Sequence, residues 1–113
     1  MTKRILIDTD PGIDDSLAIL LALASPEPSL EGLSVVHGNC SLEQATRNAL
    51  SVLELAHASH IPVAQGCELP LVRRSLLATE THGNTGLGYA KLPEPQSKPI
   101  GQHGSDFLVE KIL

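Results

Sequence analysis

The chain has 113 residues, of which 42% are hydrophobic, and a net charge of −5, which fits a single soluble domain. Eight Lys and Arg residues against thirteen Asp and Glu residues, with one Tyr and one Phe, exclude the basic and aromatic surface of a nucleic-acid-binding protein. We find no apolar segment long enough for a signal peptide or a membrane span and only two Cys residues, so we expect a cytoplasmic protein with free thiols.

The first elements predicted along the chain are a strand and a helix. Residues 5–7 form a continuous apolar run, typical of a strand buried on both faces, and Pro11-Gly12 turns the chain after it. A helix is predicted to begin near Asp14, and Pro26 and Pro28 are expected to end it after Ala24. Its apolar side chains recur at helical spacing on one face: Leu17, Leu20, Leu21 and Ala24.

The same strand-and-helix pattern then repeats. Residues 33–36 predict a second strand, and Ser41 with Gln44 forms a capping-box signature for a helix that runs to about Ser59. Its predicted buried face consists of Ala45, Ala49, Val52, Leu53 and Ala56. Residues 61–64 predict a third strand. Two successive β-α-β crossovers imply a parallel sheet, so we expect an α/β fold with a Rossmann-like parallel sheet flanked by helices.

The last third of the chain has less regular patterning. Residues 68–103 contain four Pro residues and a Gly-rich stretch, which indicates a long functional loop. A final helix is predicted from about Ser105 and is still apolar at Leu113. Because a three-stranded parallel sheet normally continues, we expect residues 1–113 to be one partial domain, truncated at its carboxyl end.

The most informative local feature is the acidic run Asp8–Asp15, which holds four carboxylates. Like charges this close raise one another's pKa unless a cation neutralises them. The run offers only oxygen ligands, which favours calcium or magnesium over zinc or copper. An EF-hand fits poorly, because Ile13 stands where that loop needs Gly. The alternative is a solvated acidic turn that caps a helix.

A second polar cluster is expected beside the first. Ligands of open α/β sheets bind outside the carboxyl ends of the strands, where Asp8–Asp15 follows the first predicted strand and Asn39 follows the second. Asn39 is a candidate substrate contact or a turn residue that bonds locally. His82 is a candidate to close over this crevice or a plain loop residue. We interpret Arg47 and Asn48 as structural or surface residues.

Three motifs follow one another along the chain: Asp8-Thr9-Asp10-Pro11-Gly12-Ile13-Asp14-Asp15, Val36-His37-Gly38-Asn39 and His82-Gly83-Asn84-Thr85-Gly86-Leu87-Gly88. In residues and order they resemble the inosine-uridine-preferring nucleoside hydrolases. The resemblance covers the amino-terminal part of that family's domain and implies the nucleoside hydrolase fold. It also implies a calcium-dependent N-ribohydrolase, which splits a ribonucleoside into free base and ribose, and a homo-oligomer in the full-length family.

The same resemblance implies roles for individual residues. Asp10 and Asp15 would hold the calcium ion, and Asp10 would be the catalytic base that takes a proton from a calcium-bound water. Asp14, Asn39 and His82 would bind the substrate, Asp14 through a ribose hydroxyl. The carboxylates would also stabilise the positive charge that develops on the sugar when the glycosidic bond breaks.

Two other interpretations remain open at this point. Asp8-Thr9-Asp10 also resembles the nucleophile and acid of haloacid-dehalogenase-like phosphatases, but Gly12 stands where that motif has Thr or Val. The second alternative is a non-catalytic remnant of the hydrolase family. Because the resemblance places further metal and ribose ligands in later segments of that family's domain, we expect this chain alone to be inactive or weakly active. We expect Asp8 to support the loop. Gly12 and Gly38 are expected where a nearby ligand or a positive φ excludes a β-carbon.

Overall fold

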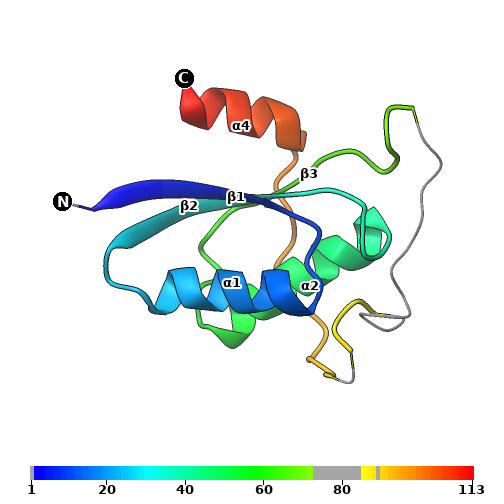
Figure 1. Ribbon diagram of the computed structural model, residues 1–113, viewed down its shortest axis with the longest axis horizontal. Helices are drawn as coiled ribbons and strands as arrows, with labels where there is room; N and C mark the ends of the chain where they lie inside the picture. Colours follow the sequence, from blue (N-terminus) through cyan, green and yellow to red (C-terminus); the bar gives the residue numbers. More distant parts are fainter. Residues whose placement is uncertain (1, 73–84, 89) are drawn as a thin grey trace.

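The computed structural model describes residues 2–72, 85–88 and 90–113. Its elements are, in chain order, β1 (Lys3–Thr9), α1 (Ile13–Ala24), β2 (Pro28–Val35), α2 (Leu42–Leu55), β3 (Val63–Gln65) and α4 (Gly104–Ile112). In this part of the chain the strands form a parallel sheet in the order β1-β2-β3. Helices α1 and α2 cover one face and α4 covers the other (Figure 1). The predicted α/β fold is therefore confirmed.

Strands β1 and β2 begin before the apolar runs that predicted them, because they pair with each other ahead of those runs. β1 pairs with β2 from Lys3, opposite Pro28, to Thr9, opposite Val35. Pro28, which we expected only to end the first helical segment, is thus the first residue of β2. The missing N–H of a proline is tolerated at the first residue of a strand. β3 begins at Val63, two residues later than predicted.

Helix α2 has the predicted start and an earlier end. The Ser41 hydroxyl accepts a hydrogen bond from the Gln44 N–H at 3.2 Å, which caps the helix. The helix ends at Leu55 and not near Ser59, because His57 adopts a left-handed φ of 56°. The Ala58 N–H then donates to the Leu53 carbonyl at 2.7 Å, which closes the helix terminus.

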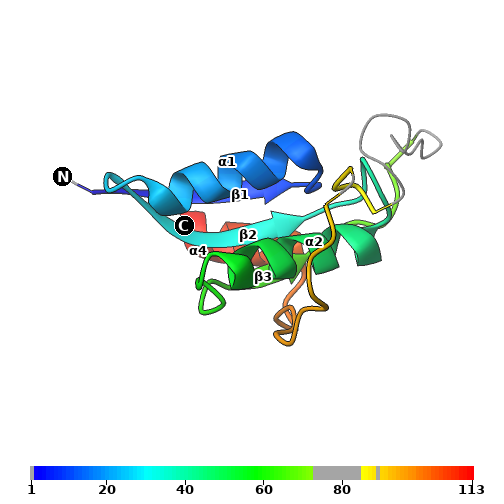
Figure 2. The same ribbon diagram turned by 90° about the horizontal axis from the view of Figure 1, so that it is seen from below.

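The hydrophobic core lies between the sheet and helices α1 and α2. These two helices run side by side in Figure 2. The predicted face of α2 is buried, and Ala45, Ala49, Val52 and Leu53 all belong to the core. In α1 the predicted face is only partly right: Leu20 packs against the core, but Leu17 is 63% exposed and Leu21 is 68% exposed. Ile19 is buried in their place. α1 is apolar almost all round, so its spacing does not select one face.

Helix α4 is anchored to the opposite face of the sheet by Phe107, which is 2% exposed. A β-carbon at Gly32 of β2 would lie 2.4 Å from Phe107 Cζ. Strand β2 therefore accepts the ring only where it has no side chain.

We expect Gly32→Ala to lower the free energy of unfolding by about 1–3 kcal/mol, because overpacking forces Phe107 out of position. Urea unfolding of the purified protein measures this. The double variant Gly32→Ala/Phe107→Leu is expected to lose less unfolding free energy than the two single variants lose together, because the smaller side chain relieves the collision. An unchanged midpoint for Gly32→Ala would contradict this packing.

Candidate functional site

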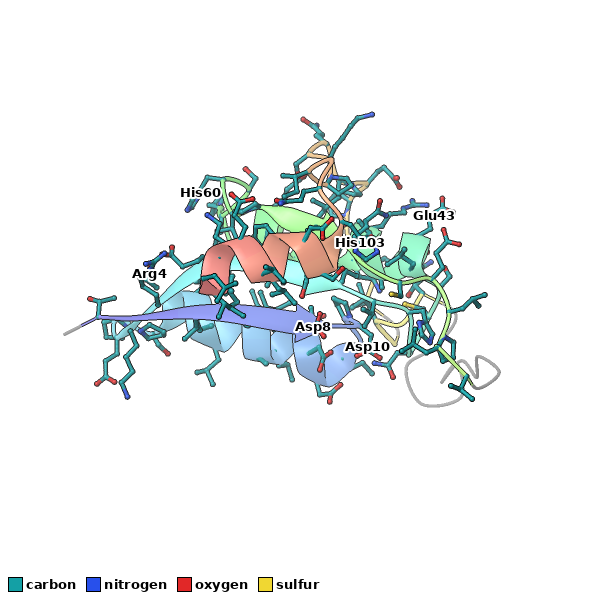
Figure 3. All side chains as sticks on the ribbon, turned by 90° about the horizontal axis from the view of Figure 1, so that it is seen from above. Arg4, Asp8, Asp10, Glu43, His60 and His103 are labelled. Carbon is teal, nitrogen blue, oxygen red and sulfur yellow. The ribbon has the colours of Figure 1, made fainter. Side chains whose placement is uncertain are left out.

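The acidic loop, residues 8–15, lies at the carboxyl end of β1 and leads directly into α1 (Figure 3). Figure 3 places Asp8 and Asp10 beside the start of α1, with Arg4 near the opposite end of the strand. Asp14 and Asp15 lie in the first turn of α1, where the helix dipole favours negative charge. The strand, turn and helix thus gather these carboxylates at one edge of the sheet.

Asn39, which follows β2, holds Asp10 through two hydrogen bonds. The Asn39 backbone N–H donates to Asp10 Oδ2 at 2.8 Å, and its side-chain amide Nδ2 donates to the Asp10 carbonyl at 3.0 Å. Gly38 also touches Asp10, because a β-carbon at Gly38 would lie 2.0 Å from Asp10 Oδ2. Gly38 does not have a positive φ. The reason for this glycine is therefore the Asp10 side chain itself.

The other carboxylates of the loop have different surroundings. Asp15 is half-buried, and its Oδ2 accepts hydrogen bonds from the Thr9 hydroxyl at 2.7 Å and from the Asp10 N–H at 3.3 Å. The Ser34 hydroxyl of β2 donates to Asp8 Oδ1, so Asp8 links the first two strands. Asp14 is exposed. The structure thus brings Asp10, Asp15 and Asn39 together, while His82 lies outside the described residues.

Burial raises the pKa of Asp10 above its ordinary value of 3.8, and the adjacent Asp15 carboxylate raises it further. The Asn39 N–H offsets part of this effect, because a hydrogen bond to the charged form lowers the pKa. The folded protein therefore disfavours two negative charges at Asp10 and Asp15. A cation bound between them would remove this cost.

The acidic loop offers the kind of ligand atoms that a hard divalent cation binds. Asp10 and Asp15 offer carboxylate oxygens, the ligands that calcium and magnesium prefer. Within residues 2–72, 85–88 and 90–113, no group of three or more His, Cys, Asp or Glu side chains is arranged to enclose an ion. Calcium takes six to eight oxygens, so these two side chains provide only part of its shell.

Asn48 is a contact residue whose importance the sequence did not reveal. It is buried on α2, and its side-chain amide donates to the Pro11 carbonyl at 3.1 Å and to the Thr85 carbonyl at 2.6 Å. It thereby connects the acidic loop with the third motif. The available signal was a polar side chain among the apolar positions of an amphipathic helix, which requires hydrogen-bond partners once it is buried.

Cys40 lies close to this site and is buried, whereas Cys67 is exposed. Burial raises the pKa of the Cys40 thiol to about 11, and the charge of Asp10 adds to the effect. At pH 8 only roughly one Cys40 in a thousand is then a thiolate. We expect iodoacetamide to alkylate Cys67 alone in the native protein at pH 8, and both residues in urea. Peptide mass spectrometry measures this, and rapid alkylation of native Cys40 would contradict its burial.

The fold and the site together define an α/β domain with a carboxylate-rich loop at the carboxyl edge of a parallel sheet, where such domains bind their ligands. A family model described as inosine-uridine preferring nucleoside hydrolase matches residues 5–113. The chain belongs to this family. The family assignment agrees with the resemblance of the three motifs and does not support the phosphatase alternative.

Several relatives and solved structures are similar to the chain. It is 48% identical over 111 residues to the probable uridine nucleosidase 2 of Arabidopsis thaliana, covering 96% of this chain and 34% of that protein. It is 39% identical to the inosine-uridine preferring nucleoside hydrolase of Crithidia fasciculata, covering 100% of this chain and 36% of that protein. The purine-preferring ribonucleoside hydrolase of Gardnerella vaginalis superposes with a TM-score of 0.91 at 32% identity, covering 97% and 36% of the two chains.

A solved plant nucleoside hydrolase superposes with a TM-score of 0.89 at 40% identity, covering 99% of this chain and 36% of that chain. The chain spans about a third of the length of the curated relatives it matches. Among the described residues, no helix has the length and apolar character needed to cross a membrane.

Proposed function

We propose that the protein hydrolyses the N-glycosidic bond of ribonucleosides to give free base and ribose. The observation that carries this proposal is the Asp10 carboxylate, which the Asn39 N–H holds at 2.8 Å beside Asp15 at the carboxyl edge of the sheet. Membership of the nucleoside hydrolase family supports the reaction class. Similar proteins carry the names uridine nucleosidase and inosine-uridine preferring nucleoside hydrolase, which favours nucleosides as substrates.

In the proposed reaction Asp10 is the general base. Its carboxylate takes a proton from a water molecule as the water oxygen attacks the anomeric carbon of the ribose. The bond from that carbon to the base nitrogen breaks, and the departing base takes up a proton from solvent water. The Asn39 N–H, which donates to Asp10 Oδ2 at 2.8 Å, holds the carboxylate in one orientation for this role.

The remaining site residues act on the sugar. Asp14, exposed in the first turn of α1, accepts a hydrogen bond from a ribose hydroxyl, and Asn39 orients Asp10. His82, which lies outside the described residues, is a further candidate substrate contact by the family resemblance. Positive charge develops on the ribose ring as the glycosidic bond breaks, and the carboxylates at this edge of the sheet stabilise it.

We propose Ca²⁺ as the cofactor, with Asp10 and Asp15 among its ligands. A bound calcium ion supplies positive charge, which offsets the repulsion between the two carboxylates and makes nearby water more acidic. The pKa of Asp10, raised by burial and by Asp15, supports a cation at this position. A homo-oligomer of the full-length protein remains a prediction from the family resemblance.

Ribose release from inosine and uridine by the purified protein tests the proposal. From residues 1–113 alone we expect weak release at most in the presence of calcium, and we expect an excess of chelator to abolish it and added calcium to restore it. A phosphomonoester such as p-nitrophenyl phosphate, which contains no glycosidic bond, is the contrasting substrate. Phosphate release from it without any ribose release from the nucleosides would contradict the proposed reaction.

A further inference from the structure

Asn48 contacts both the acidic loop and the segment Thr85–Gly88, although it belongs to neither. Its side chain is 3% exposed. The amide nitrogen donates to the Pro11 and Thr85 carbonyls at 3.1 and 2.6 Å, and the amide oxygen accepts a hydrogen bond from Gln44 Nε2 at 2.9 Å. A buried amide with partners at both ends has one orientation, because rotation would break three hydrogen bonds.

The hydrogen bond to Pro11 is one of a series that fixes the backbone around Asp10. Three successive carbonyl oxygens, those of Asp10, Pro11 and Gly12, each accept a hydrogen bond from a side chain. The donors are Asn39 Nδ2 at 3.0 Å, Asn48 Nδ2 at 3.1 Å and the Ser16 hydroxyl at 2.7 Å. These three donors come from the loop after β2, from α2 and from α1. The backbone that carries the Asp10 carboxylate is therefore held from three elements.

The segment Thr85–Gly88 packs closely against the same junction through its glycines. Gly86 has a φ of +86°, and a β-carbon there would lie 3.1 Å from Asn48 Nδ2 and 3.2 Å from Cys40 Sγ. Gly88 has a φ of +63°, and a β-carbon there would lie 3.1 Å from Ile13 Cδ1. Both the backbone conformation and the close approach require glycine. The segment thus contacts the acidic loop and Asn48 directly.

We propose that Asn48 is a positioning residue, which fixes the Asp10 backbone relative to the segment Thr85–Gly88 and so builds one nucleoside site from two separate motifs. It acts through the Pro11 and Thr85 carbonyls and does not touch the substrate. This inference rests on the proposed function for its catalytic consequence. Its structural consequence, a coupled position of the two segments, is measurable without any substrate.

The test compares Asn48→Leu, which keeps the side-chain size but removes the amide, with the parent protein. Residue-resolved hydrogen exchange follows the Asn39 N–H, which donates to Asp10 Oδ2, and the Leu87 N–H of the docked segment. We expect both to exchange about 10-fold faster or more, because a lost hydrogen bond loosens only its surroundings. Core amides of β2 and α2, such as those of Leu33 and Leu53, are expected to keep their protection.

Two further variants make the test specific. Ser51→Ala, one turn further along α2, removes a hydrogen bond to the Pro93 carbonyl and serves as the matched control. It is expected to leave the Asn39 exchange rate unchanged. Gly86→Ala perturbs the same junction while Asn48 is intact, and it decides the question if Asn48→Leu does not fold. We expect it to accelerate the same two amides.

The hydrolysis assay gives the catalytic readout. We expect kcat/KM for uridine to fall by about 100-fold in Asn48→Leu, because small displacements of a catalytic group are costly. We expect the double variant with Gly86→Ala to lose less than the product of the single losses, because both act on one junction. If the parent protein releases no ribose, the proposed function is refuted. The exchange rates still test the positioning role of Asn48 in that case. Unchanged Asn39 exchange in both variants, or equal acceleration of all amides, would overturn that role.

Discussion

Replacement of Asp10 by Asn is expected to lower ribose release from inosine and uridine by about 10²- to 10⁴-fold, the contribution of a positioned general base. The amide keeps the size of the side chain but cannot take a proton from water. In the structure the Asn39 N–H holds the Asp10 carboxylate beside Asp15, so the variant removes the base from a defined position. Steady-state assays of the purified variant in saturating calcium measure the loss.

A matched control is Asp106→Asn, which makes the same chemical change at an exposed position in the first turn of α4. This control is expected to retain the parent's rate. Full activity in Asp10→Asn would rule out Asp10 as the base, and equal losses in both variants would show that the acid-to-amide change itself is damaging.

The Asp10→Asn variant is expected to be at least as stable as the parent protein when calcium is removed. Because the pKa of Asp10 is raised in the folded state, the folded protein holds this proton more tightly than the unfolded chain does. Stability is therefore lost as the pH rises from the ordinary value of 3.8 through the folded-state pKa. Thermal melts with chelator at pH 7 should give Asp10→Asn an equal or higher Tm, and the difference should disappear below pH 3.8.

Replacement of Gly38 by Ala is expected to lower ribose release by about 100-fold, although it leaves every carboxylate in the chain. The new β-carbon would lie 2.0 Å from Asp10 Oδ2 and 2.6 Å from Asp10 Cγ. It would also lie 2.8 Å from Asp10 Cβ, which side-chain rotation does not move, so the Asp10 side chain must turn away from the Asn39 N–H and the backbone must shift as well. The position of the base is lost, and the Tm is expected to fall because the backbone must shift.

Gly101→Ala is the natural control, because a β-carbon at Gly101 has no atom within 4 Å. It makes the same substitution at an exposed position and should leave both the rate and the Tm unchanged. If Gly38→Ala kept the parent's kcat/KM, the contact between Gly38 and Asp10 would have no part in catalysis.

Local patterns predicted several parts of this protein correctly. The apolar residues of α2 recur every three to four positions, and Ser41 stands at the start of that helix, so its buried face and its cap follow from neighbouring residues alone. The acidic run likewise needed no tertiary information, because its carboxylates are adjacent in the chain. The order of strands and helices then predicted the parallel sheet.

Other features depended on contacts between distant residues. α1 is apolar on nearly all sides, so only its packing on the sheet and α2 selected Ile19 for burial and left Leu17 exposed. Asn48 resembled an ordinary helix residue until the fold placed it against Pro11, which lies 37 positions away. Gly38 was predicted as a glycine required by a ligand or by its φ, whereas the fold showed that the Asp10 side chain excludes a β-carbon there.

The sequence by itself therefore determined the class of fold and the chemical groups of the site. Periodicity, capping residues and turn residues act over a few positions, and these interactions can be recognised in a linear pattern. Only the tertiary structure decided how the groups are held, because the hydrogen bonds from Asn39 and Asn48 to the acidic loop span 29 and 37 residues. Contacts of that separation form only when the parallel sheet brings the carboxyl ends of its strands together.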